Sequence, residues 1–225
     1  MADRIDLHTH TFFSDGDLLP SELVRRAVTL GYAAIALTDH ADASNLEQIL
    51  LQLKQFLREQ GSDFPLTVIP GVELTHVLPA RIAPLAKRAK ELGAGLVVVH
   101  GETITEPVAV GTDRAAVECA DVDILAHPGF ITLEEAQIAA QRGVYLEISA
   151  RKGHSLTNGH VAAMARAAGA KMVLDTDTHT PSDMIDQAFA RAVARGAGLN
   201  DVEIEAATVA NPRELVERAK KRLTI

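Results

Sequence analysis

Short apolar runs alternate along the whole chain with longer stretches in which apolar side chains recur every three or four residues. The runs are apolar at nearly every position, as in parallel strands that are buried on both faces. In order they are 5–7, 34–37, 66–69, 96–99, 122–126, 144–148 and 172–174. The alternation predicts seven strands separated by helices.

The stretches between the runs have the periodicity of amphipathic helices. Residues 45–58 are an example, since Leu46, Ile49, Leu50 and Leu53 fall on one helical face. The same pattern predicts helices at 21–30, 84–92, 132–141 and 160–168, and the tail predicts two more, near 184–195 and 212–222. Four glycines follow predicted helices and are expected to adopt left-handed C-terminal caps: Gly31, Gly93, Gly143 and Gly169.

Seven alternations without a break in composition favour a single parallel α/β domain that spans residues 1–225. An open, doubly wound sheet would also fit this pattern. The positions of the polar residues favour a barrel instead.

Histidines and acidic residues gather where the predicted strands end. The segments in question are His8-Thr9-His10, Thr38-Asp39-His40, Gly71-Val72-Glu73, His100, His127 and Asp175-Thr176-Asp177-Thr178-His179. The sixth strand ends Glu147-Ile148-Ser149 and is expected to supply no metal ligand. In a barrel of parallel strands these ends meet at one face, where active sites lie.

This gathering indicates a metal centre. A single histidine at a strand end is usually an ordinary hydrogen-bonded residue. A whole set of buried imidazoles and carboxylates without cations would leave acids unpaired, at a cost of several kcal/mol. Histidine nitrogen and carboxylate oxygen without thiolate suit zinc, manganese or iron better than calcium.

Composition and net charge bear on the class of substrate and on the location of the protein in the cell. The formal net charge is −8 and no long basic tract is present, so a nucleic-acid substrate is not favoured, although a small anionic substrate is not excluded. No apolar stretch is long enough to span a bilayer, Cys119 is the single cysteine, and the first residues do not resemble a signal peptide. We therefore expect a cytoplasmic protein; the sequence leaves its oligomeric state open.

The motifs together resemble the PHP family, named after polymerase and histidinol phosphatase. The resemblance runs from residue 3 to about residue 220. It rests on His-Thr-His at 8–10, Thr-Asp-His at 38–40, Gly-Val-Glu at 71–73, Ala-His-Pro at 126–128, Asp-Thr-Asp-Thr-His at 175–179 and Asn-Pro-Arg-Glu-Leu at 211–215. It implies a distorted (βα)7 TIM-like barrel with a metal site at the C-terminal ends of its strands.

Membership of this family would also imply a centre of two or three divalent transition metal ions. The first metal would take His8, His10, Glu73 and Asp177; the second would share Glu73 and add His100 and His127; the third would take Asp15, His40 and His179. Some relatives have histidine at the place of Asp15, a difference that would weaken or retune the third metal.

The resemblance implies a metal-dependent phosphoesterase. Three divalent ions would bring a charge of about +6 against about −3 from the three carboxylates, so the pocket would select a small anionic phosphorylated substrate. A phosphomonoester such as histidinol phosphate would be attacked by a metal-bound hydroxide, with Asp177, Glu73 and His179 as the catalytic residues. Candidate substrate-binding residues are Arg151 and Lys152 after the sixth strand and Arg81 in the loop after the third, and weaker candidates are His76 and His154.

Three other functions remain open. The first is a metal-dependent nuclease or phosphodiesterase that acts on nucleotides or oligonucleotide ends. The second is an amidohydrolase, which commonly has a modified lysine on the fourth strand where this chain has His100. The third is a non-catalytic regulatory domain that is stabilised by metal.

Overall fold

The computed structural model describes residues 4–223, and within this range seven strands form a parallel sheet in the order β1-β2-β4-β5-β6-β7-β8. A further two-residue strand, β3, pairs with β4. The strands are β1 (Arg4–Asp6), β2 (Tyr32–Leu37), β3 (His40–Ala41), β4 (Thr67–Leu74), β5 (Leu96–His100), β6 (Ile124–Ala126), β7 (Tyr145–Ser149) and β8 (Met172–Asp175). The seven predicted strands are confirmed, and so is the α/β barrel.

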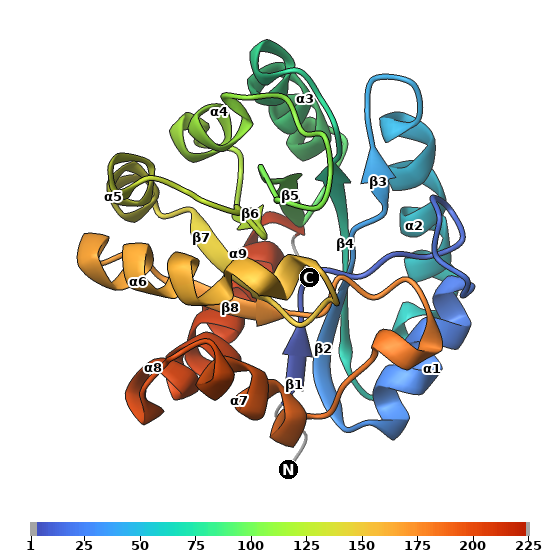
Figure 1. Ribbon diagram of the computed structural model, residues 1–225. Coiled ribbons are helices and arrows are strands. Elements are labelled where there is room, and N and C mark those ends of the chain that lie inside the picture. Colours follow the sequence, from blue (N-terminus) through green and yellow to red (C-terminus); the bar gives the residue numbers. More distant parts are fainter. Residues whose placement is uncertain (1–3, 224–225) are drawn as a thin grey trace.

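Helices cover the outside of the sheet, which curls almost into a closed barrel (Figure 1). They are α1 (Pro20–Thr29), α2 (Leu46–Gln60), α3 (Pro79–Glu91), α4 (Thr112–Glu118), α5 (Leu133–Arg142), α6 (Asn158–Ala168), α7 (Gln187–Gly196), α8 (Asp201–Glu205) and α9 (Asn211–Leu223). Four short helical segments join them: η1 (Gly61–Asp63), η2 (His154–Thr157), η3 (Pro181–Asp183) and the π-helical η4 (Ala206–Ala210). None of the helices within residues 4–223 combines the length and the apolar character needed to cross a membrane.

Local sequence signals set the helix ends, as α5 illustrates. The Thr132 side chain accepts a hydrogen bond from the Glu135 amide, and Glu135 bonds back to Thr132 in a capping box. Gly143 ends the helix with φ 74°, a left-handed conformation that suits glycine. The predicted cap glycines all have positive φ: Gly31, Gly93, Gly143 and Gly169.

The apolar core lies in two layers on either side of the sheet. The outer layer packs between strands and helices, and the inner one fills the barrel with side chains such as Ile5, Val98 and Val173. Helix α9 adds Leu215 and Val216 to the inner layer, so it closes the barrel at the N-terminal ends of the strands; it lies behind the sheet in Figure 1. The polar residues at the opposite ends are left to form a site.

A seam separates β1 from β8, which are the first and last strands of the barrel. The two strands share no ladder, only an isolated bridge between Thr9 and Thr178. Buried side chains take over the backbone hydrogen bonds along the seam: Arg4 Nη1 to Leu174 O at 2.9 Å, Leu7 N to Asp175 Oδ1 at 2.7 Å and Thr176 N to Asp6 Oδ1 at 3.1 Å. The barrel is thus completed by charged side chains rather than by strand pairing.

Several boundaries differ from the sequence predictions. The third strand is longer than the run 66–69 predicts, because β4 continues through Pro70 and Gly71 to Leu74, where it pairs with β3 and β5. Helix α3 begins at Pro79 rather than at 84, since proline is tolerated in the first turn of a helix. The short helices α4 and α8 are not predicted, because their few apolar residues give no clear periodicity.

Candidate metal centre

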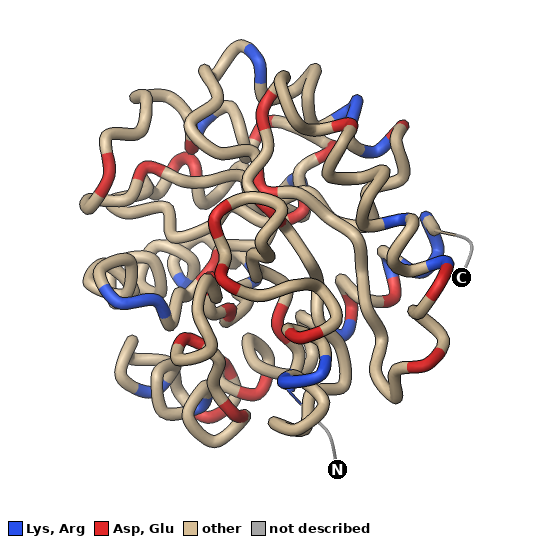
Figure 2. Tube along the Cα trace, turned by 90° about the vertical axis from the view of Figure 1, so that its right-hand side faces the viewer, with Lys and Arg blue, Asp and Glu red and all other residues tan. Residues whose placement is uncertain are grey.

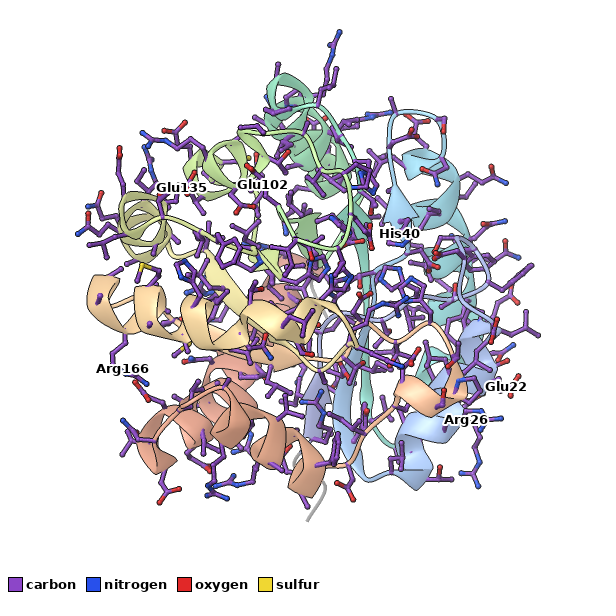
Figure 3. The ribbon with its side chains drawn as sticks, viewed as in Figure 1. Glu22, Arg26, His40, Glu102, Glu135 and Arg166 are labelled. Carbon is purple, nitrogen blue, oxygen red and sulfur yellow. The ribbon has the colours of Figure 1, made fainter. Side chains whose placement is uncertain are left out.

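The structure gathers the nine predicted ligand residues at the C-terminal ends of the strands. His8 and His10 follow β1, His40 begins β3, Glu73 lies within β4, His100 ends β5, His127 follows β6, Asp177 and His179 follow β8, and Asp15 comes from the loop between β1 and α1. Seven of the nine are buried, His40 is half-buried and Asp15 is exposed. Figure 3 labels His40 beside β3.

The first cluster consists of His8, His10, Glu73 and Asp177. His8 Nε2 lies 3.2 Å from Glu73 Oε1 and 3.6 Å from Asp177 Oδ1. His10 Nε2 lies 3.0 Å from the same Asp177 oxygen. Four ligand atoms from three strands thus face one point.

The third cluster consists of Asp15, His40 and His179. Asp15 Oδ1 is 3.3 Å from His40 Nε2 and 3.2 Å from His179 Nε2, and the two nitrogens are 3.3 Å apart. The His10 ring stacks on the His179 ring at a centroid distance of 4.1 Å, so this cluster adjoins the first.

The second cluster contains His100 and His127, whose ring centroids are 4.5 Å apart. Glu73 Oε1 lies 3.8 Å from His127 Nε2, whereas Glu73 Oε2 bonds to the Thr75 hydroxyl and to His40 Nδ1. A shared role of Glu73 between two metals would therefore use a single oxygen.

Several histidines of the centre are anchored through Nδ1. His8 Nδ1 lies 2.6 Å from Glu147 Oε2, and His40 Nδ1 lies 2.6 Å from the Thr75 hydroxyl. His179 Nδ1 lies 2.9 Å from the Asp177 carbonyl oxygen and 2.8 Å from Arg151 Nη1. Partners of this kind fix the ring of a metal-binding histidine and leave Nε2 free to coordinate.

Two observations show that the residues fit metal ions. Within residues 4–223, the buried atoms without a hydrogen-bond partner include His8 Nε2, both nitrogens of His10 and of His127, Glu73 Oε1 and Asp177 Oδ1. Such atoms are costly to bury unless an ion meets them. A tetrahedral ion with bonds of about 2.0–2.1 Å separates its ligand atoms by about 3.3–3.4 Å, which matches the spacing in the third cluster.

The pKa directions reveal how closely these groups interact. Burial lowers the pKa of His10 to about 3. Burial acts the same way on His40, but Glu73 and Asp15 outweigh it and raise the pKa of His40 to about 10. In Glu73 burial acts upward, yet His8 and His40 hold its pKa well below the usual range. Without metal, protons on some histidines of the centre balance the negative charge of its carboxylates. Metal binding would displace those protons.

Backbone strain is concentrated at the same end of the barrel. Within residues 4–223, the non-glycine residues with positive φ are His76 (51°), His127 (29°) and Asp177 (52°). Side chains rarely adopt this conformation, and the cost is typical of functional sites.

The predicted substrate-binding residues fall in different places. Arg151 reaches the centre, where Nη1 donates to the Asp177 carbonyl at 2.8 Å and Nε lies 3.3 Å from Asp177 Oδ2. Lys152 is exposed, and its side chain makes no hydrogen bond or ion pair within residues 4–223. Arg81 is exposed in the first turn of α3 rather than in the preceding loop, because this helix begins early.

The sixth strand contributes Glu147 to the site, a residue that the sequence analysis does not single out; that this strand supplies no metal ligand stays a prediction. This strand is β7, and Glu147 is fully buried in it with Oε2 against His8. A carboxylate within an otherwise apolar buried strand was the available signal. Glu106 and His154 also lie here and had no such signal for a central role: Glu106 comes from the loop between β5 and α4, and His154 begins η2.

Comparisons with known proteins agree with this description. A model of the PHP domain matches residues 6–117. An uncharacterized protein of Methanocaldococcus jannaschii is 50% identical over 218 residues, which cover 96% of this chain and 99% of the relative. Ribonuclease P protein component 3 of Methanosarcina barkeri is 27% identical over 220 residues, covering 91% of this chain and 85% of the relative.

The chain is also similar to part of an exoribonuclease in sequence and to two solved structures in fold. The 5'-3' exoribonuclease Rnm of Escherichia coli is 38% identical over 72 residues, which cover 32% of this chain and 22% of the relative. An archaeal ribonuclease P with mature tRNA contains a chain with TM-score 0.66 at 17% identity, covering 98% of this chain and 90% of that one. Histidinol phosphate phosphatase of Lactococcus lactis, complexed with zinc, L-histidinol and phosphate, has TM-score 0.61 at 17% identity, covering 88% and 95%.

Proposed function

The chain belongs to the PHP family, whose members include metal-dependent phosphoesterases, and from this premise we propose that it hydrolyses a small phosphate ester. The substrate class is a phosphomonoester, with histidinol phosphate as a specific candidate. The observation that carries the proposal is the set of unpartnered, buried imidazole and carboxylate atoms at ligand spacing. We propose two or three divalent ions, of zinc, manganese or iron, as their partners.

Bound divalent ions would supply Lewis acidity toward a phosphoryl oxygen and would lower the pKa of a water molecule. The protein's own part is to hold the ligands in place. His8 is fixed by Glu147, and Arg151 bonds to the backbone of Asp177. Asp177 Oδ2 lies 3.3 Å from Arg151 Nε, and Oδ1 lies 3.0 Å from His10 Nε2. These contacts fix the carboxylate and support our proposal that Asp177 orients the attacking water.

The charge of the pocket supports an anionic substrate, although less strongly than the sequence suggests. Glu106 and Glu147 add two carboxylates to Asp15, Glu73 and Asp177, which lowers the expected charge with three divalent ions from about +3 to about +1. Arg151 adds one positive charge at the rim, where its side chain is 30% exposed. A phosphomonoester with close to two negative charges would complement this pocket.

The loops around the centre suggest that the rest of the substrate is partly apolar. Large exposed side chains occur on the segments that follow four of the strands, three in loops and one in η2: Phe12, Ile104, Phe130 and Leu156. Binding pockets for small organic molecules combine apolar walls with a few polar groups. These segments would contact the organic part of the ester.

The similarity to an exoribonuclease and to a ribonuclease P component favours a second candidate, hydrolysis at the end of an oligonucleotide. Figure 2 shows lysine and arginine segments scattered among acidic ones over the face in view, without a continuous basic band. A long nucleic acid normally requires such a band. If the second candidate is correct, we therefore expect the substrate to be a mononucleotide or the end of a short oligonucleotide.

The deciding experiment uses protein expressed in medium containing zinc, manganese and iron. Elemental analysis should find two or three transition metals per chain, and release of inorganic phosphate should be measured on histidinol phosphate, sugar phosphates and mononucleotides. The parallel arm measures cleavage of bis-p-nitrophenyl phosphate and of a short 5'-phosphorylated RNA. Monoester turnover supports the proposal, diester or RNA turnover alone supports the second candidate, and bound metal without turnover on any substrate would indicate a non-catalytic domain.

A further inference from the structure

His154 and Glu106 lie beside the second cluster, although neither belongs to the nine residues that resemble the family pattern. Their side chains extend it from two histidines to three, with an added carboxylate. This inference rests on the metal centre of the proposed function and concerns the composition of its second site.

His154 is buried and held in one orientation. Its side chain is 4% exposed, and its ring stacks on the His127 ring with centroids 4.0 Å apart and an interplanar angle of 13°. Nδ1 lies 2.8 Å from the Thr103 hydroxyl and 3.1 Å from the Thr105 hydroxyl. With Nδ1 donating to threonine, the lone pair of Nε2 faces the centre, the arrangement seen in metal-binding histidines.

Two carboxylate groups face the lone pair of His154 Nε2. His154 Nε2 lies 3.4 Å from Glu106 Oε1 and 3.6 Å from Asp177 Oδ2. His100 repeats the arrangement, since its Nδ1 contacts the Gly101 carbonyl and its Nε2 lies 3.2 Å from Glu106 Oε2. A neutral imidazole whose proton is on Nδ1 would be repelled by a carboxylate oxygen at these distances unless a cation lay between them. The third cluster has a similar ligand spacing of 3.2–3.3 Å.

The loop that carries Glu106 is fastened at its base. Glu102 Oε1 accepts hydrogen bonds from the amides of Gly111 and Asp113, and Asp113 accepts one from the Glu102 amide. Glu102 is labelled beside α4 in Figure 3. Residues 103–110 therefore form a loop that is closed at its base and contains Glu106.

The base of this loop also packs against the segment that carries His127. A Cβ on Gly129, which has φ 57°, would stand 2.1 Å from the Glu102 carbonyl oxygen, so only glycine permits this approach. The position of Glu106 is thereby tied to that of His127. His76, from the segment after β4, adds a contact of 3.2 Å from Nε2 to Glu106 Oε2 and steadies the carboxylate.

We propose that His154 and Glu106 are ligands of the second metal, which they bind together with His100, His127 and Glu73. Three imidazoles with carboxylate oxygens favour zinc, and a site with this many protein ligands holds its ion more firmly than the third site, where Asp15 is 56% exposed. Glu106, 38% exposed, closes the site on the solvent side.

The test is equilibrium zinc binding measured by competition with a chromophoric chelator. His154→Ala should raise the dissociation constant of one zinc site by about 10–100-fold or abolish binding there. His160→Ala should bind zinc with wild-type affinity. His160 is a matched control because it lies in the next helix, α6, and bonds to the Ile131 carbonyl away from the centre. The visible absorption of the cobalt-substituted protein should change in His154→Ala and stay the same in His160→Ala.

Glu106→Gln provides an independent arm, because an exposed loop residue can be replaced without risk to the core. It should weaken the same zinc site by about 10-fold, with Glu118→Gln on α4 as the control. Circular dichroism checks folding in each case. Wild-type affinity and cobalt spectrum in either His154→Ala or Glu106→Gln would overturn the proposal. If the wild type still binds zinc and hydrolyses phosphate esters, this inference alone fails. A wild type that binds none of zinc, manganese and iron would refute the proposed function as well.

Discussion

The two ends of the barrel are built from the same strands and differ in almost every property. At the N-terminal ends, Ile5 and Val173 meet Leu215 of α9 in an apolar layer. At the C-terminal ends, a few residues further along, buried histidines and carboxylates leave ligand atoms without protein partners.

This contrast shows how the fold separates stability from function. The apolar end buries hydrocarbon side chains against one another, so it contributes to the free energy of unfolding without help from a ligand. The polar end buries unpaired atoms and strained backbone, which lower stability until ions bind. Substitutions at the two ends should therefore affect different measurements.

The largest expected effect is at the polar end. Glu73→Ala and His8→Ala should reduce hydrolysis by about 10³-fold or more, since each removes a ligand of the first cluster. Glu73→Ala should be the more severe, because its Oε1 also faces His127. Turnover and metal content should be measured together with circular dichroism, and wild-type turnover at saturating metal would refute the assigned centre.

The apolar end should show the reverse behaviour. Leu215→Ala removes a fully buried side chain from the inner layer and should lower the free energy of unfolding by about 2–5 kcal/mol. Its metal content and turnover at low temperature should match the wild type. Denaturant titration measures the effect, with the exposed Glu217→Ala on the same helix as the control. A loss of metal in Leu215→Ala would contradict the idea that the two ends of the barrel serve stability and function separately.

A smaller effect is expected at the third cluster. His40→Ala or His179→Ala should reduce turnover by about 10–100-fold and should be partly rescued by added manganese or zinc. The reason is that this cluster opens to solvent at Asp15, so a weakened ion can be replaced from solution. Turnover measured against metal concentration tests this; full activity with only two metals retained would show the third site to be dispensable.

The smallest effect concerns Arg151. Arg151→Ala should raise KM for a monoester by about 10-fold, and Arg151→Lys should recover only part of the loss because an ammonium lacks the planar fork. The guanidinium also bonds to the Asp177 carbonyl, so metal content must be measured alongside the kinetics. An unchanged KM would leave substrate binding to the metals, and a loss of metal would assign Arg151 a positioning role.

The sequence predicts the repeated strands and their polar ends because both depend on local pattern. The apolar run before His8 and the one before His127 each show where a strand ends, and parallel topology brings such ends together. Sequence alone misses Glu106 and indicates His154 only as a weaker candidate for substrate binding, because both residues come from other parts of the chain. His154 and Glu106 reach the centre through a turn and a loop, and their path depends on close packing at Gly129 rather than on periodicity.

Glu147 was missed for a different reason. The prediction looked for side chains just beyond each strand, whereas Glu147 lies inside β7 and points into the barrel two positions after Tyr145. Strand alternation places such a residue on the inner face. Burial of an unpaired charge there is costly, which marks it as a partner of the centre rather than of the core.

The seam between β1 and β8 has a consequence for how the chain folds. Arg4 and the Leu174 carbonyl that it binds are separated by 170 positions in a chain of 225 residues, so this contact closes a very long loop. Contacts of such long range form late, because the entropy of loop closure must be overcome first. The first cluster draws on both edges of the seam, with His8 and His10 on one and Asp177 on the other. During synthesis on the ribosome, the earliest of the proposed ligands must therefore wait for the last strand to emerge. If the protein binds metal as we propose, full metal uptake would mark the end of folding rather than its beginning.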